Sequence, residues 1–228
     1  MTQKSAGDNG QNHITSGRNK TVRLAKMGML VAISVVLVYF IHFPIFPAVA
    51  FLEYDPADIP ILMGTFAFGP LAGVLLTVVT SVIQGVTVSA QNGLYGIIMH
   101  IIATSVLVLV AGFIYKKNKT RKGAVLALVC GTVAMVIVMI CANMVITPLF
   151  MGVPRSVVWD LMPFIAGFNL VKAGINGLVT FILYKRISAF LHRYKAIYKM
   201  IYSLRMQHVM WCIRRCFIHY LFIAYNMI

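Results

Sequence analysis

Residues 164–183 read FIAGFNLVKAGINGLVTFIL, an apolar run that contains a single charge. A helix of about 20 apolar residues is long enough to cross the hydrocarbon core of a bilayer. The composition extends this reading to the whole chain, because 60% of the 228 residues are hydrophobic and only 11% are charged. That balance excludes a soluble globular domain, and it predicts an all-α integral membrane protein.

The one charge in this run is Lys172, and two amides accompany it. Asn169, Lys172 and Asn176 follow a three-then-four spacing, which places them within about 60° of one another on a helix. A cation inside a membrane span is costly and marks a candidate functional site. The alternative is a polar contact between helices that only holds the bundle together.

Five more apolar spans precede this one, and the second of them is short. The spans cover about 22–41, 57–68, 70–90, 94–115, 123–147 and 163–184. Prolines begin the span 57–68 and Gly69-Pro70 ends it. We therefore expect a short second helix that a tight turn joins to the third.

Basic residues decide how these spans cross. They lie in three blocks, before the first span, after the fourth and after the sixth, whereas the loops 42–56, 91–93 and 148–162 carry only Arg155. Basic residues mark the cytoplasmic side, so we predict six transmembrane helices with both termini in the cytoplasm. The same distribution explains the net charge of +15 without a nucleic-acid partner.

Three regions follow from this pattern. Residues 1–20 are polar and predict a disordered cytoplasmic leader. Residues 21–190 form the six-helix membrane domain, and 191–228 form a basic, aromatic tail to which we assign no function. The residues 48–50, Ala-Val-Ala, resemble a signal-peptidase site, but the full length of the first span favours a retained helix.

Catalytic and nucleotide-binding motifs are missing from the sequence. It contains no GxxxxGK[ST] loop, no HExxH and no GxSxG, so we expect no enzyme, no bound cofactor and no hydrolysis of ATP by this chain. The acidic residues lie outside the spans or at their ends: Asp8, Glu53, Asp55, Asp58 and Asp160. The lack of a carboxylate within the spans weakens, without excluding, a self-sufficient secondary transporter.

The first external loop and the fifth span add candidate binding residues. Asp58 is placed to cap the short helix, whereas Glu53 and Tyr54 are free to reach a ligand from outside. Asn143 lies toward the outer end of the fifth span and is predicted at the depth of Asn169. Such amides offer donors and acceptors to a rigid, uncharged heterocycle, although a hydrogen bond between helices is the alternative for Asn143.

The first span carries a stripe of small residues. Ala25, Gly28 and Ala32 repeat the three-then-four spacing, and such stripes let helices approach closely. The residues alone favour packing within the chain over a partner protein.

Residues 51–73, FLEYDPADIPILMGTFAFGPLAG, resemble a signature of the substrate-binding S components of energy-coupling factor (ECF) transporters, of the riboflavin type. The resemblance continues in 96–100 (GIIMH), in 143–148 (NMVITP) and in 168–172 (FNLVK) with Asn176. It covers about residues 20–190, and the tail after about residue 200 departs from the family.

The resemblance implies high-affinity capture of riboflavin from outside a prokaryotic plasma membrane. A partner module, consisting of a transmembrane coupling subunit and two ATPases, would drive release with ATP. The loop 42–56 would act as a lid, and Ala25, Gly28 and Ala32 would contact the coupling subunit. The substrate-binding residues would be Glu53, Tyr54, Asn143, Asn169, Lys172 and Asn176. An intramembrane lipid-modifying enzyme is the alternative of another class, but no nucleophile–base pair is visible.

Overall fold

The computed structural model describes the backbone of residues 6–184 and the side chains of residues 20–184 except Gln91. Its helices are α1 (Ala6–Phe40), α2 (Asp58–Phe68), α3 (Pro70–Val86), α4 (Gly93–Lys117), α5 (Arg121–Met151) and a last helix, Arg155–Tyr184. Four helical segments are long and apolar enough to cross a membrane: Lys20–Phe40, α4, α5 and the last helix. The prediction of a mostly helical, multi-pass membrane protein is confirmed.

The long helices extend beyond the predicted spans. Helix α1 begins at Ala6, so residues 6–20 are helical where we expected a disordered leader. Once a helix has nucleated in the apolar span, each added residue gains a hydrogen bond, and no proline interrupts the chain before Pro44. The predicted tail, 191–228, lies outside the described residues.

The connection between α5 and the last helix is also shorter than predicted. Helix α5 continues through Pro148 to Met151, and Gly152 ends it with a φ of +65°. The left-handed conformation of a glycine is a common way to end a helix. The last helix begins at Arg155, so the expected external loop 148–162 is reduced to a turn at 152–154.

The short second helix and its tight turn are confirmed. Gly69 joins α2 to α3 with a φ of +99°, and Pro70 begins α3. A Cβ atom on Gly73 would collide with the side chain of Thr65, so glycine is required where the two helices cross. Arg23 of α1 donates a hydrogen bond of 3.0 Å to the carbonyl of Phe68, where α2 ends.

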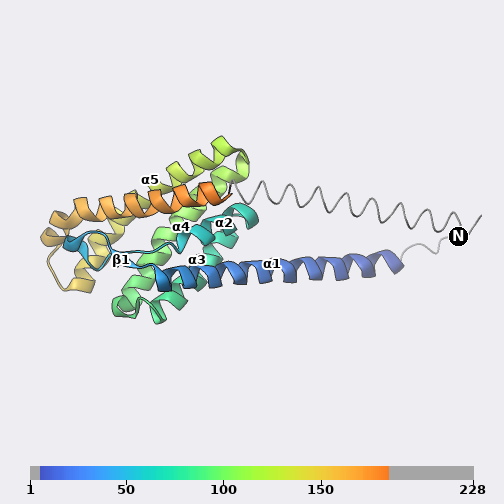
Figure 1. The fold of residues 1–228 in the computed structure, drawn as a ribbon, viewed down its shortest axis with the longest axis horizontal. Coiled ribbons are helices and arrows are strands. Elements are labelled where there is room, and N and C mark those ends of the chain that lie inside the picture. The colour runs from blue at the N-terminus through green and yellow to red at the C-terminus, as the bar shows by residue number, and fades with distance from the viewer. Residues whose placement is uncertain (1–5, 185–228) are drawn as a thin grey trace, which may run out of the picture. The chain divides into compact units, whose positions relative to one another are not determined.

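Within the compact unit 1–181, α4 packs against α3 and α5, and α1 packs against α2 and α3 (Figure 1). Helix α1 buries Met27, Ser34 and Val38 against its neighbours. The residues from Ile182 onward belong to a second unit, of which the structure describes only the final turn of the last helix.

The loop 42–56 is an ordered ribbon. Strands β1 (Phe43–Pro44) and β2 (Glu53–Tyr54) pair antiparallel, with a 3-10 turn at Pro47–Val49 between them. Val49 is fully buried with Val158, Met162 and Ile165 of the last helix. This apolar cluster anchors the loop to the helix that also carries Lys172.

Candidate functional site

A buried ion pair between Asp55 and Lys172 forms the centre of the site. Asp55 Oδ2 accepts hydrogen bonds from Lys172 Nζ at 2.8 Å and from Gln84 Nε2 at 3.2 Å. Its Oδ1 atom accepts a hydrogen bond of 3.1 Å from the backbone N–H of Ala57. Asp55 is 4% exposed and Lys172 6%. The lysine that the sequence singled out therefore has its counter-ion within the same chain, as a buried cation requires.

The charge on Asp55 is stable at neutral pH. Burial raises the pKa of its carboxyl group, but the neighbouring Lys172 ammonium lowers it further, so that the net pKa is about 2 against an ordinary 3.8. Burial, followed by the Asp55 charge, raises the pKa of the Tyr54 hydroxyl. Asp55 is therefore an anion and Tyr54 a neutral donor under physiological conditions.

Asn176 connects the loop 42–56 to α2. Its Nδ2 atom donates to the Asp55 carbonyl at 3.0 Å and to Asp58 Oδ2 at 3.1 Å. Its Oδ1 atom accepts a hydrogen bond of 2.9 Å from the Tyr54 hydroxyl. These bonds use both donors of the amide and its oxygen. Asn176 therefore holds Tyr54, Asp55 and Asp58 in place.

Asp58 does not cap the short helix. The N-cap of α2 is Ala57, without a side-chain cap, and the Asp58 carboxylate instead accepts a hydrogen bond of 2.7 Å from Thr104 Oγ1 of α4. The carboxylate next to the first backbone N–H groups of α2 is that of Asp55. The capping prediction is wrong because Asp58 points into the bundle, where it is fully buried.

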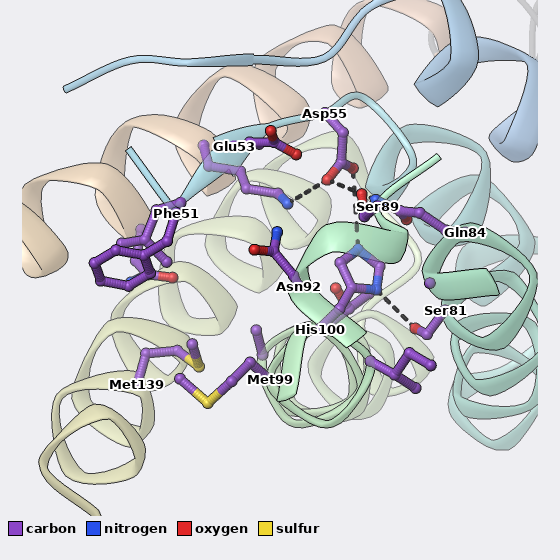
Figure 2. A pocket seen from close by; sticks show the side chains of 18 of the residues that line it. Phe51, Glu53, Asp55, Ser81, Gln84, Ser89, Asn92, Met99, His100 and Met139 are labelled. Carbon is purple, nitrogen blue, oxygen red and sulfur yellow. Dashed lines mark hydrogen bonds and ion pairs between the residues drawn. The ribbon is translucent and has the colours of Figure 1, made fainter. Parts of the chain in front are cut away.

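His100 of α4 faces Asp55 and Ser81, as Figure 2 shows, and its ring also lies close to Asp58. Its Nδ1 atom lies 2.7 Å from Ser81 Oγ. Its Nε2 atom lies 3.9 Å from Asp55 Oδ1 and 3.8 Å from Asp58 Oδ1, and it makes no hydrogen bond although it is buried. A buried ring nitrogen of this kind is available to a ligand or a water molecule.

A cavity of about 100 Å³ opens beside the ion pair, and a second of about 50 Å³ adjoins it. Lys172, Asn169 and Glu53 line the first cavity, together with Gln84 and His100. The second cavity is mostly apolar. The two share wall residues from the loop, from the 3-10 turn Ala90–Asn92 and from α4: Phe51, Leu52, Asn92, Gly96 and Met99.

The predicted binding residues separate into two groups. Asn143 lines the second cavity, and its amide bonds within α5, to the Met139 carbonyl at 2.7 Å and to Thr147 Oγ1 at 2.8 Å. It makes no hydrogen bond to another helix among the described residues. Tyr54 and Asn176 line neither cavity. The sequence had led us to expect that both contact a ligand.

Sequence reasoning missed Asp55, Gln84 and His100 as site residues. Asp55 could have been found, because Lys172 needs a counter-ion and three of the five acidic residues lie at 53–58. His100 appeared only within the family resemblance, and Gln84 had no signal beyond its place in an apolar span.

The small-residue stripe of α1 is uncovered. Ala25, Gly28 and Ala32 are all exposed, and no atom lies within 4 Å of the position that a Cβ on Gly28 would occupy. The described residues therefore do not use the stripe for packing within the chain, although the residues alone favoured that role.

Comparison with known proteins places the chain among transporter subunits. The family model for the substrate-specific component of ECF transporters matches residues 22–184. The riboflavin transporter RibU of Staphylococcus aureus (strain TCH60) is 30% identical over 192 residues, which cover 81% of this chain and 99% of that protein. The riboflavin transporter FmnP of Bacillus subtilis (strain 168) is 29% identical over 171 residues, covering 74% and 86%.

Solved structures show the same fold. The S component of a bacterial ECF transporter matches with a TM-score of 0.67 at 29% identity, covering 75% of this chain and 98% of that one. FolT bound with folic acid, at 22% identity and a TM-score of 0.52, shares the fold over 72% of this chain and 92% of its own. Because the family model spans most of the described bundle and the S. aureus relative is covered almost end to end, this chain belongs to the family of ECF transporter substrate-specific components.

Proposed function

We propose that this chain binds riboflavin and confers specificity for it on an ATP-driven ECF importer. The observation that carries the proposal is the wall of the first cavity, where the buried Lys172 ammonium lies beside the Asn169 amide. Membership of the family and the riboflavin transporters among its relatives support this choice of ligand. The chain itself would need no cofactor and catalyse no reaction.

The lining of the first cavity suits both ends of a flavin. Lys172, Asn169 and Glu53 offer charged groups and an amide, which can bind ring carbonyls, ring nitrogens or the ribityl hydroxyls. Phe168, Met135 and Met139 line the same cavity and offer an apolar surface for the dimethylbenzene ring. Tyr54 and Asn176 would act indirectly, by holding Asp55 and hence Lys172 in place.

The loop 42–56 would act as a lid. Sites for ligands of this size measure about 300–1,000 Å³, whereas the two adjoining cavities measure about 100 and 50 Å³. Their shared wall includes Phe51 and Leu52 of the loop. A displacement of this wall would join the cavities into one site, and it is the movement that a lid would make.

Six crossings with both termini in the cytoplasm remain our topology. Helix α2 is short at 11 residues, about 16 Å. Both the Asp55 carbonyl and the Ala57 N–H, which precede this helix, are hydrogen-bonded. The chain therefore enters the helix without an unsatisfied backbone group at either atom.

Transport would depend on partners in the plasma membrane. We propose a transmembrane coupling subunit and two ATPases, because the sequence has no nucleotide-binding loop. The uncovered stripe of Ala25, Gly28 and Ala32 would let a helix of the coupling subunit approach closely.

Flavin fluorescence tests the ligand directly. Titration of riboflavin with the purified full-length chain should quench the fluorescence to saturation without ATP, whereas a flavin-free vitamin such as folate should not compete. No quenching by a folded sample would reject riboflavin as the ligand. Accumulation of riboflavin by the chain alone in liposomes, driven by an ion gradient, would instead show a secondary transporter.

A further inference from the structure

A third cavity lies apart from the site, between α5 and the last helix. Its volume is about 330 Å³, and it shares no lining residue with the two cavities at the site. Apart from Thr132, its lining is apolar or glycine. Helix α5 contributes Val125, Val129 and Val133, and the last helix contributes Gly174, Leu178 and Phe181. We call it the α5 groove.

The α5 groove follows the axis of α5. Val125, Val129 and Val133 succeed one another at intervals of four residues along α5, a length of about 12 Å. Glycine opens the opposite wall, because no atom lies within 4 Å of the position of a Cβ on Gly174. These dimensions fit a hydrocarbon chain that lies along the helices.

Basic side chains stand at one end of this groove. Arg121 precedes Val125 by four residues and Lys122 precedes it by three, so both project from the same face of α5 as the groove. They are exposed, and they belong to a block at 116–122 with five basic residues and no acidic one. Within the part of the chain that the structure describes, no ion pair engages either of them.

We propose that the α5 groove binds one anionic phospholipid, with an acyl chain along the valines and the phosphate on Arg121 and Lys122. An apolar groove that ends at two unpaired cations is complementary to a molecule with a hydrocarbon tail and an anionic head. Arg121 and Lys122, rather than the groove, select the head group. The proposed topology implies that this lipid comes from the cytoplasmic leaflet. The binding itself does not depend on that topology.

The number and type of lipids that the purified chain retains test this proposal. The full-length chain is purified in detergent with equal amounts of phosphatidylglycerol and phosphatidylcholine, and native mass spectrometry counts the retained lipids. Two basic contacts should favour phosphatidylglycerol about 30-fold. The double variant Arg121→Gln, Lys122→Gln should lower this preference to about threefold or less.

Two further variants separate the head-group contact from the groove. Lys116→Gln with Lys117→Gln removes the same charge from the end of α4 and should keep the preference. Gly174→Leu projects into open space and should fill the groove, so that less of both lipids is retained.

Riboflavin affinity is measured in the same samples. It should stay unchanged in every variant, because the groove and the site share no residue. This control separates a failed lipid site from misfolding or from a wrong ligand. An equal preference in the wild-type chain and in the Arg121, Lys122 variant would overturn the proposal, as would a dimer that Gly174→Leu dissociates, which would assign the groove to a second copy.

Discussion

Two triplets in this chain have the same three-then-four spacing and opposite surroundings. Asn169, Lys172 and Asn176 are 2%, 6% and 0% exposed, and their side chains bond to the loop, to α2 or to their own helix. Ala25, Gly28 and Ala32 are exposed and cover nothing within the described chain. One helix face is buried and hydrogen-bonded inside the protein, and the other is left bare.

The difference shows what spacing alone can and cannot establish. Spacing places three residues on one helix face, whereas the chemistry of the side chains decides what that face requires. An ammonium and two amides must find partners before they can be buried, so the polar triplet turns inward. Small apolar residues have no such requirement in lipid, and a face made of them remains free for a partner helix.

The strongest test of the inward face is Lys172→Ala. It removes the cation of a buried pair and leaves Asp55 uncompensated, which should destabilise the chain by about 3–5 kcal/mol. Riboflavin affinity should fall at least about tenfold, because unpaired polar groups on the ligand cost about 1–3 kcal/mol each. Thermal denaturation in detergent and quenching titrations measure the two effects.

A double variant distinguishes support from ligand contact. Lys172→Ala with Asp55→Asn removes both charges, so most of the lost stability should return while affinity stays low. Unchanged affinity in either variant, if folded, would remove Lys172 from the site and weaken the contrast between the two faces.

Larger side chains on the exposed face of α1 test whether a partner helix docks there. Gly28→Leu with Ala32→Leu should reduce riboflavin uptake by cells at least about tenfold, because the coupling subunit can no longer approach closely. Affinity of the purified chain should not change, since neither residue packs within it. Met29→Leu with Val36→Leu is the control, because both residues are exposed and already large. Normal uptake by the stripe variant would mean that the partner docks elsewhere.

A smaller effect is expected where the loop is anchored. Val158→Ala removes a fully buried side chain from the Val49 cluster and should weaken the docking of the loop by about 2 kcal/mol. External protease should then cleave residues 42–56 faster, and riboflavin should protect them in both proteins. Val157→Ala, on an exposed neighbour, should have no effect. Equal cleavage with and without riboflavin in the wild-type chain would argue for a fixed loop.

The last effect is a dependence of stability on pH, and it concerns Asp55. Its pKa falls from 3.8 to about 2 in the folded chain, so its charge stabilises the fold above about pH 4, and this contribution disappears as the pH falls toward 2. The shift corresponds to about 2 kcal/mol. Asp55→Asn should therefore lower the melting temperature at neutral pH, and this deficit should shrink on acidification. The exposed Asp160→Asn serves as control, and a deficit independent of pH would contradict the assigned charge.

The sequence predicted the parts of this arrangement that are local. The short second helix follows from Pro60 and Gly69-Pro70, and the shared face of Asn169 and Lys172 follows from helical periodicity. Depth and direction could not be predicted. Asn176 lies about 6 Å further along the helix than Lys172, which brings it to the start of α2 rather than to the cavity.

Contacts between segments that are distant in the sequence could not be predicted either. Asp55 reaches Lys172 across 117 residues of sequence, and only the docking of the loop on the last helix makes that possible. Likewise, the predicted span ended before Pro148, yet α5 continues through this residue. Proline is tolerated in a membrane helix because neighbouring groups can satisfy the freed backbone carbonyl.

The distance in sequence between the two charges has a consequence for biogenesis. Asp55 leaves the ribosome long before Lys172, so the anion is already present when the last helix enters the membrane. The lysine can then be inserted as half of a neutral pair, which avoids much of the cost of an isolated cation in lipid. We therefore expect Asp55→Ala to reduce the fraction of chains whose last helix integrates. A glycosylation site placed after that helix would report the failure, and full integration of the variant would show that the pair forms only after insertion.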